Sequence, residues 1–213
     1  SVLKLAMTVT LRNGKVIPGR YTFKGILTIG NMVNLITTSS RERKKVTLLE
    51  GWTIEQIADE LNRRLQIDTY KFISLSKDFN FLHSLNIDAP SIEGFLFPDT
   101  YIFLSSYTEE QIITIMVNQF FHNYKKYIKR FKGHTSLSMR EITTLASIIQ
   151  GEAMYDDEMP IISSVYHNRL KRKMFLQADP TIQYIIPGKN RRLYNKHLRV
   201  DSPYNTYKYK GLP

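Results

Sequence analysis

The chain has 213 residues, of which 42% are hydrophobic, so it can bury the core of one large domain or of two small ones. Its net charge of +11 suits an anionic partner, such as nucleic acid, a membrane surface or an acidic cell-wall polymer, although charge that only maintains solubility gives the same composition. The absence of cysteine excludes disulfides, thiolate chemistry and cysteine-ligated zinc.

The two ends of the sequence have the character of cuts in a longer protein. A strand-like pattern starts at residues 2–9, there is no signal peptide, and no apolar run approaches the roughly 20 residues that a membrane helix needs. We therefore expect the chain to be a piece of a longer parent, from which any targeting segment has been removed.

The first 70 residues contain a weak internal repeat with an offset of 25 residues. In each copy a β-prone segment, residues 21–23 or 46–49, precedes a threonine that can cap a helix, Thr28 or Thr53. Gln56 lies three residues after Thr53, as a capping box requires. Each copy predicts a strand followed by a short amphipathic helix, a unit that ordinary α+β domains also contain.

A turn-rich stretch, residues 88–101, joins two parts of the chain. One glycine and two prolines interrupt the backbone pattern there, and Glu93 and Asp99 flank a group of aromatic residues.

The next helix is expected to start after Thr108, because Gln111 follows at the capping-box spacing. Its apolar positions continue to about Tyr127. The basic residues 125–132 are then expected to form a loop-like stretch.

Ser138 and Glu141 also have the spacing of a capping box and predict another helix start. Its predicted apolar face consists of Ile142, Leu145, Ala146, Ile149 and Ala153. At about 100° per residue, Glu152 falls on the edge of this face near Leu145, so we expect its carboxyl group to be partly buried. A second helix is expected after Pro160, with four residues facing inward: Ile162, Val165, Tyr166 and Leu170.

Residues 169–213 are the most basic part of the chain, with eleven Lys and Arg against two Asp, and also hold five Tyr. Helical periodicity is poor there, so loops and short strands are expected. Long loops in a compact domain are often functional.

Several kinds of active site are excluded by their missing motifs. The sequence has no phosphate-binding loop and no G-x-S-x-G nucleophile elbow, and its five His lack metal-ligand spacing. Glycoside cleavage, by contrast, needs a carboxylic acid of raised pKa, and burial on an apolar helix edge could make Glu152 such an acid. On spacing alone, a structural role is the more common one for such a residue: Glu152 would cap the helix or pair with a nearby Arg or Lys.

Five segments, in order along the chain, resemble the signature blocks of the MltG (YceG-like) family of endolytic murein transglycosylases. They are residues 92–101 (IEGFLFPDTY), 145–153 (LASIIQGEA), 162–170 (ISSVYHNRL), 176–184 (LQADPTIQY), and 202–207 (SPYNTY) with GLP at 211–213. The family's catalytic glutamate aligns with Glu152. Gly-Glu-Ala at residues 151–153 also resembles cell-wall hydrolases related to spore cortex-lytic enzymes, in which that Glu is the acid.

The resemblance implies a mechanism that needs no metal, no organic cofactor and no second catalytic carboxylate. One Glu protonates the glycosidic oxygen between N-acetylmuramic acid and N-acetylglucosamine. The same carboxylate then acts as base on the muramic C6 hydroxyl, which closes on C1 and leaves a 1,6-anhydro end.

The sequence departs from the family pattern at Gln150, where most members carry Glu. Three explanations stay open: natural variation at a supporting position, an engineered change, or a disabled catalytic position. We favour natural variation, because Glu152 precedes a small residue, as the acid does in related transglycosylases. Residues 150 and 152 point about 200° apart on a helix, so only one of them can face a cleft.

The resemblance implies further substrate-binding candidates, which are Gln177, Asp179, Tyr204, Asn205, Tyr207, Asn168, Gln150 and Glu93. Amide, carboxylate and phenol groups hydrogen-bond sugars, and tyrosine faces pack on pyranose rings. The alternative is that these residues hold the loops in place, and Asp179-Pro180 could simply start a turn.

The fold expected from these features is α+β, with a small LysM-like subdomain (residues 1–85) packed on a mixed α+β catalytic domain (residues 86–213). The expected partners are peptidoglycan strands and the cell-wall synthesis machinery, without nucleic acid. The parent is expected to be anchored in the cytoplasmic membrane by an N-terminal helix absent here, with this part outside. A non-catalytic peptidoglycan-binding module or a glycan hydrolase stays open as an alternative.

Overall fold

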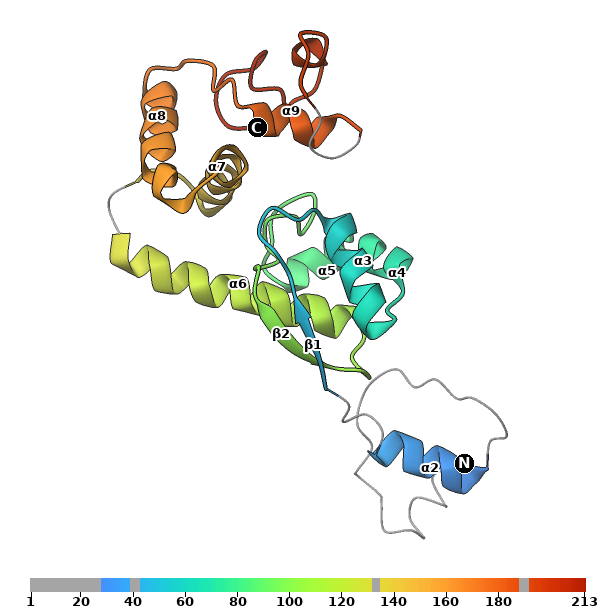
Figure 1. The fold of residues 1–213 in the computed structure, drawn as a ribbon. Helices are drawn as coiled ribbons and strands as arrows, with labels where there is room; N and C mark the ends of the chain where they lie inside the picture. The colour runs from blue at the N-terminus through green and yellow to red at the C-terminus, as the bar shows by residue number, and fades with distance from the viewer. Residues whose placement is uncertain (1–27, 39–42, 132–134, 188–191) are drawn as a thin grey trace. The chain divides into compact units, whose positions relative to one another are not determined.

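The structure is a computed structural model that describes residues 28–38, 43–131, 135–187 and 192–213. It divides into two compact units, Ser1–Lys129 and Arg130–Pro213, each of which is described by itself. The described residues are mostly helical with one two-stranded antiparallel sheet (Figure 1), which agrees broadly with the α+β expectation. The β-prone segment at residues 21–23 lies outside the described residues.

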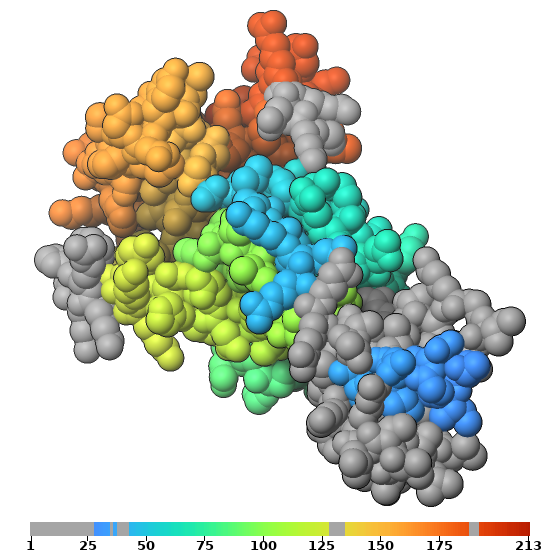
Figure 2. All heavy atoms as spheres, turned by 60° about the horizontal axis from the view of Figure 1, so that its bottom comes forward, coloured from blue at the N-terminus to red at the C-terminus, as the bar shows by residue number. Residues whose placement is uncertain are grey.

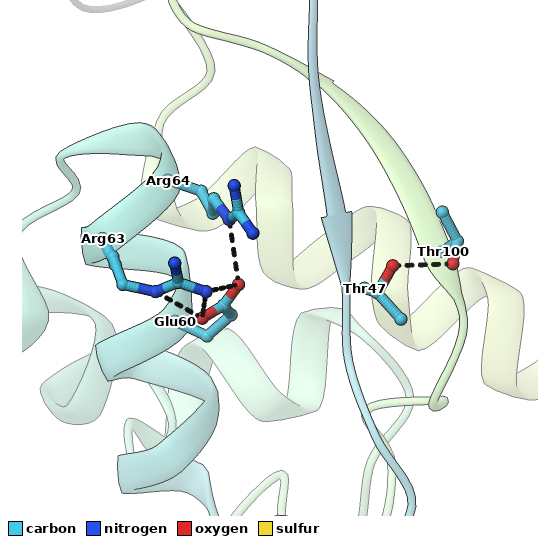
Figure 3. A network of polar contacts seen from close by, with 5 residues as sticks. All are labelled: Thr47, Glu60, Arg63, Arg64 and Thr100. Carbon is cyan, nitrogen blue, oxygen red and sulfur yellow. Dashed lines mark hydrogen bonds and ion pairs between the residues drawn. The ribbon is translucent and has the colours of Figure 1, made fainter.

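The two strands of unit 1 are β1 (Arg43–Thr47) and β2 (Thr100–Leu104), which pair antiparallel. Val46 lies opposite Tyr101 in the register, and both side chains are buried. The neighbouring threonines, Thr47 and Thr100, hydrogen-bond through their hydroxyls at 2.9 Å (Figure 3). One face of the sheet is therefore buried and apolar, and the other, with Thr47 and Thr100, faces solvent.

The predicted capping box at Thr53 and Gln56 is confirmed at the start of α3 (Ile54–Leu65). Its apolar face is fully or nearly buried through five residues: Ile54, Ile57, Ala58, Leu61 and Leu65. The opposite face carries Glu60 with Arg63 and Arg64 (Figure 3). Because both arginines are exposed, each pair contributes only about 0.3–0.5 kcal/mol, and burial of the apolar face holds the helix in place.

Helix α2 (Ile29–Thr38) starts as predicted, since the Thr28 hydroxyl accepts a hydrogen bond from the Asn31 N–H at 3.2 Å. Two short helices follow α3: α4 (Thr69–Leu75) and α5 (Phe79–Ser84). In the space-filling view of Figure 2, the blue-to-teal spheres of β1, α3 and α4 form one continuous surface, and α3 contacts both of the others.

The turn-rich stretch between α5 and β2 is held by local polar contacts. The Tyr101 hydroxyl donates to the Phe97 carbonyl at 2.5 Å. The Asp99 carboxylate accepts from the Thr100 N–H at 2.7 Å and from the Gln119 side chain at 2.8 Å. These contacts therefore fix the turn-rich stretch where the chain enters β2.

Helix α6 (Glu109–Phe131) starts at the predicted position but ends later than predicted. The Gln111 side chain accepts a hydrogen bond from the Thr108 N–H at 2.9 Å, which confirms the predicted start of the helix. The prediction of a loop at residues 125–132 was wrong, because the helix continues to Phe131. Lysine and arginine have good helix propensity, so a basic run does not by itself end a helix.

Unit 2 contains α7 (Met139–Glu152), α8 (Met159–Lys171) and α9 (Asp179–Ile185), together with short 3₁₀ turns at Asp156–Glu158 and His197–Arg199. Helix α7 packs against both α8 and α9 (Figure 1). Their buried core consists of Leu145, Ile148, Tyr166, Leu176 and Ala178.

Two expectations for unit 2 need correction. The short strands expected in residues 169–213 do not occur in its described part, where α9 begins at Asp179 and Pro180. Proline at the first helical turn has its backbone angle set for a helix, so Asp179-Pro180 starts a helix rather than a turn. Val165, expected to face inward on α8, is 44% exposed, whereas Tyr166 is buried as expected.

Among the described helices, none is both long and apolar enough to cross a membrane. The predicted domain boundary at residues 85 and 86 falls inside unit 1, because the segment up to residue 129 belongs to that compact unit. The assignment of a LysM-like domain and a catalytic domain stays a prediction.

Candidate active site

Glu152 is the last residue of α7, and its surroundings make its carboxyl group a weaker acid than usual. The helix starts at a Ser138–Glu141 capping box, as predicted, and ends when Ala153 adopts an extended conformation. Although Glu152 as a whole is exposed, partial removal of its carboxyl group from water raises its pKa, and the negative charge of Asp179 raises it further. The partial negative charge at a helix C-terminus favours the protonated form as well.

Glycine at position 151 lets α7 approach α9 closely. A Cβ atom built on Gly151 would lie 2.8 Å from Cβ and 3.0 Å from Cγ of Pro180. Carbon atoms in contact normally stay about 3.5–4.0 Å apart, so no larger residue fits without movement. Because Pro180 is next to Asp179, this close approach brings the Asp179 carboxylate near Glu152.

Tyr166 of α8 reaches Glu152 from the core of unit 2. Its side chain is only 4% exposed and packs with Leu145 and Ile148 of α7. The influence of the Tyr166 hydroxyl on the Glu152 carboxyl group opposes the rise in the pKa of Glu152. Burial, followed by the charge of Glu152, raises the pKa of Tyr166 to about 12, so its hydroxyl stays a donor.

Asp179 is held by the last part of the chain. The Tyr207 hydroxyl donates to Asp179 Oδ1 at 2.5 Å. Burial and this hydrogen bond raise the pKa of Tyr207, which therefore also stays protonated. Arg169 of α8 donates to the Leu176 carbonyl, and its positive charge lowers the pKa of Glu152 without reversing the net rise.

Two of the predicted substrate-binding residues, Gln177 and Asn205, are held in place by hydrogen bonds to backbone carbonyls. Gln177 is exposed, with a left-handed φ of 49°, and its N–H donates to the Thr206 carbonyl at 3.1 Å. Asn205 is 0% exposed, and its amide donates to the Leu198 and Val200 carbonyls at 3.0 and 2.7 Å. Gln177 thus presents its side chain to solvent, whereas Asn205 holds the loop.

The remaining candidates of unit 2 lie on its surface or at its edge. Tyr204 is 40% exposed, and its ring centroid lies 5.1 Å from that of Tyr184, which is 50% exposed. Asn168 is exposed on α8, and Gln150 is half-buried on α7. The two aromatic rings form an exposed pair of the kind that packs against sugars.

Glu93 lies in unit 1, whereas all the other candidates lie in unit 2. Burial raises the pKa of Glu93, and the negative charge of Glu55 adds to the rise. The backbone of Ile54, at the start of α3, acts in the opposite direction and lowers the pKa of Glu93.

Sequence reasoning missed the influence of three residues on Glu152 and its surroundings: Gly151, Tyr166 and Arg169. Tyr166 was expected only as a core residue, because its position fits the apolar face of α8. All three occur within the blocks at residues 145–153 and 162–170, and their position in those blocks was the available signal.

The unit 2 cluster offers one carboxylic acid beside a second carboxylate, two tyrosine hydroxyls and one guanidinium. Within the described part of the chain, no group of three or more His, Cys, Asp or Glu side chains could hold a metal ion. The chemistry that these groups support is proton transfer to and from a substrate oxygen.

Comparison with known proteins places these residues in a wider context. The family model described as YceG-like matches residues 1–213. Two proteins named endolytic murein transglycosylase are similar to this chain: one from Bacillus subtilis (strain 168), 34% identical over 186 residues, and one from Streptococcus pneumoniae (strain D39), 30% identical over 192 residues. These matches cover 79% and 78% of this chain, which spans only 51% and 35% of the two relatives.

A solved structure is also similar. The crystal structure of a putative yceG-like protein from Listeria monocytogenes superposes with a TM-score of 0.71 at 29% sequence identity. The match covers all of this chain and 75% of the other.

Proposed function

The chain belongs to the YceG-like family, and on that premise we propose that it cleaves peptidoglycan glycan strands as an endolytic murein transglycosylase. The proposal brings to this chain the activity named for its relatives, which it matches over somewhat more than three quarters of its length. The single observation that carries the assignment to a site is the position of Glu152 at the end of α7, where Gly151 lets Pro180 approach closely; the raised pKa of Glu152 agrees with this assignment.

Glu152 has the two properties that the reaction needs from one residue. Its carboxyl group is accessible enough to reach a glycosidic oxygen, and its raised pKa keeps more of it protonated near neutral pH than an ordinary glutamate. After donating its proton, the carboxylate can take one from the muramic C6 hydroxyl, which then attacks C1. The C1–O4 bond breaks, the C1–O6 bond forms, and the proton balance of Glu152 is restored.

The finer assignments are parts of the same proposal. Residues 1–85 form a LysM-like subdomain that contacts glycan, and Gln177, Tyr204 and Asn168 line the approach to Glu152. The parent protein is anchored in the cytoplasmic membrane, and this part acts on its outer side with the cell-wall synthesis machinery as partner. The strand–helix repeat in the sequence supports the LysM-like assignment, and the exposed Tyr184–Tyr204 pair supports a role in sugar contact. The net positive charge supports an anionic cell-wall partner.

Mass spectrometry of purified peptidoglycan, digested by the chain and by Glu152→Gln, tests the proposal. We expect 1,6-anhydro-muramyl products from the first and none from the second. Products with ordinary reducing ends, one water heavier, would identify a hydrolase instead. Binding to peptidoglycan without any product from the unaltered chain would identify a binding module.

A further inference from the structure

An open groove lies in the C-terminal segment of unit 2, and none of the residues discussed around Glu152 is among its described lining residues. Its volume is about 430 Å³, and the described residues that line it are Asp201, Ser202, Pro203 and Tyr209. Most of the lining surface is apolar, with a carboxylate and a hydroxyl as its polar groups. Binding sites for small molecules and for parts of larger ligands commonly combine these features.

Asp201 is the polar centre of this groove, and its two carboxylate oxygens differ. Oδ1 accepts hydrogen bonds from Lys208 Nζ at 2.8 Å and from the Tyr209 hydroxyl at 2.7 Å. Among the described residues, Oδ2 has no hydrogen-bond partner, and the side chain is 74% exposed. One oxygen therefore holds the side chain in place, and the other is free to accept a hydrogen bond from a ligand.

The charges at the groove are balanced. Lys208 forms an ion pair with Asp201, and its ammonium group lies 5.8 Å from the centre of the Tyr209 ring. Two opposite charges in contact largely cancel at the position of a third group, so the pair gives little net attraction to a free cation or anion. A neutral ligand that carries hydroxyl groups therefore matches the groove better than a charged one.

The remaining lining residues suit the two kinds of surface that a sugar ring presents. Tyr209 is 47% exposed, and its hydrogen bond to Asp201 limits rotation of the ring. The Ser202 hydroxyl oxygen accepts from the Tyr204 N–H at 3.2 Å, which leaves its own O–H available as a donor. An aromatic face packs on the C–H face of a pyranose, while a carboxylate and a hydroxyl bind its hydroxyl groups.

The groove is built on a loop with one buried anchor. Asn205 is 0% exposed, and its amide donates to the carbonyls of Leu198 and Val200 at 3.0 and 2.7 Å. Its own carbonyl accepts from the N–H groups of Lys208 and Tyr209, each at 3.0 Å. Because the lining residues on both sides of Asn205 are held by it, the groove exists before a ligand arrives, and binding costs little conformational entropy.

The exposed aromatic pair of Tyr184 and Tyr204 extends this surface. Tyr204 directly follows Pro203 of the groove, so their Cα atoms are only about 3.8 Å apart. A strand of linked sugars, unlike a single small molecule, is long enough to contact both the groove and the pair. The arrangement therefore favours a glycan strand over an isolated sugar.

We propose that this groove is a subsite for one neutral N-acetylhexosamine residue of a glycan strand. The Tyr209 ring packs on a face of the sugar ring, Asp201 Oδ2 accepts a hydrogen bond from one sugar hydroxyl, and the Ser202 hydroxyl donates to another oxygen of the sugar. The inference rests on the proposed function for the identity of the polymer as peptidoglycan. The groove contributes binding and takes no part in proton transfer.

Titration with N-acetylchitotetraose, a soluble neutral glycan, followed by proton–nitrogen NMR spectra, locates the binding and measures its Kd. The backbone amide signals of residues 201–209 should shift. Tyr209→Ala should raise Kd by about 10-fold, whereas Tyr209→Phe keeps the ring and should raise it less. Asp201→Ala should also raise Kd by about 10-fold, because a hydrogen bond to a charged group is lost. Since the ligand is neutral, Kd should change little between low and high salt.

Two matched variants, Tyr127→Ala and Asp88→Ala, control for the chemistry of each substitution. Both residues are exposed and lie in unit 1, so neither variant should change Kd. Weaker binding by Tyr209→Ala at an unchanged melting temperature supports the subsite. The position of the shifts in the unaltered chain decides the inference even where a variant does not fold. Shifts confined to amides outside residues 201–209, or groove variants with unchanged Kd, would overturn it.

Activity measurements separate this inference from the proposed function. If the unaltered chain releases no anhydro product, the proposed function fails, and binding of N-acetylchitotetraose at residues 201–209 still supports the subsite. If it does release the product, Tyr209→Ala should raise KM and leave kcat nearly unchanged, because the groove binds the substrate and the transition state alike. A fall in kcat with KM unchanged would assign Tyr209 to the chemical step and overturn the inference.

Discussion

Replacing Gly151 by alanine tests the close packing of α7 and α9 with a single methyl group. That group would meet Cβ and Cγ of Pro180 at 2.8 and 3.0 Å, and the proline ring cannot rotate away. Restoring an ordinary carbon–carbon contact of about 3.5–4.0 Å requires the two helices to separate by about 0.5–1 Å.

The size of the effect follows from two opposing terms. Overpacking of this kind costs about 1–3 kcal/mol, whereas alanine gains up to about 1 kcal/mol over glycine in a helix, and less at the penultimate residue of α7. The net loss of stability should be about 1–2 kcal/mol. For a unit of this size, that lowers the melting temperature by roughly 5–15 °C.

Thermal unfolding followed by circular dichroism measures this change, and Gly30→Ala provides a matched control. Gly30 also lies in a helix, but nothing comes within 4 Å of its added Cβ, so alanine there should be neutral or stabilising. At a temperature where Gly151→Ala is fully folded, its activity should still fall, because Asp179 moves away from Glu152. A Gly151→Ala variant as stable and as active as the unaltered chain would refute the reasoning.

Four further outcomes are expected. Asn205→Ala should lower the free energy of unfolding by about 1–3 kcal/mol in urea denaturation, because it removes two hydrogen bonds that the buried Asn205 amide donates to the Leu198 and Val200 carbonyls. Ser138→Ala should cost about 1 kcal/mol in the same assay through loss of the α7 cap, and an unchanged midpoint would contradict this. Tyr204→Ala should weaken sedimentation with peptidoglycan while leaving the melting temperature unchanged, whereas an equal loss of both would assign the ring to folding. The folded chain holds the Glu152 proton more tightly than the unfolded chain, so this group contributes stability below its ordinary pKa of 4.5 and loses that contribution as the pH rises through the raised pKa. The stability of Glu152→Gln relative to the unaltered chain should therefore be greater at pH 7 than at pH 4.

Helix starts were predictable because their chemistry is local. At Thr53, Thr108 and Ser138, a side chain and a partner three residues later satisfy the first backbone N–H groups, and all three boxes form. The end of α6 did have a marker in the sequence, because Gly133 follows its last helical residue, Phe131, by two positions. A basic composition was mistaken there for a loop.

The candidate site shows more clearly what sequence-based prediction cannot provide. Glu152 could be identified from its position in a block that resembles a family signature. Its carboxyl group is partly removed from water, as expected, but Glu152 lies at the end of α7, where the residue as a whole is exposed. Its partners Tyr166 and Asp179 follow at distances of 14 and 27 residues. Such contacts depend on how α7, α8 and α9 pack against one another. The apolar periodicity of a single helix carries no information about that packing.

The hydroxyl pair between Thr181 and Thr206 bridges 25 residues of sequence inside a buried setting. Helices α7 and α8 are neighbours along the chain and can associate early, whereas this bridge closes a long loop and must form late. A folding intermediate that has α7 and α8 but lacks the bridge would hold Glu152 next to Tyr166, without the tether on Asp179. We therefore expect the acidity of Glu152 to reach its final value only once the Thr181–Thr206 bridge has formed.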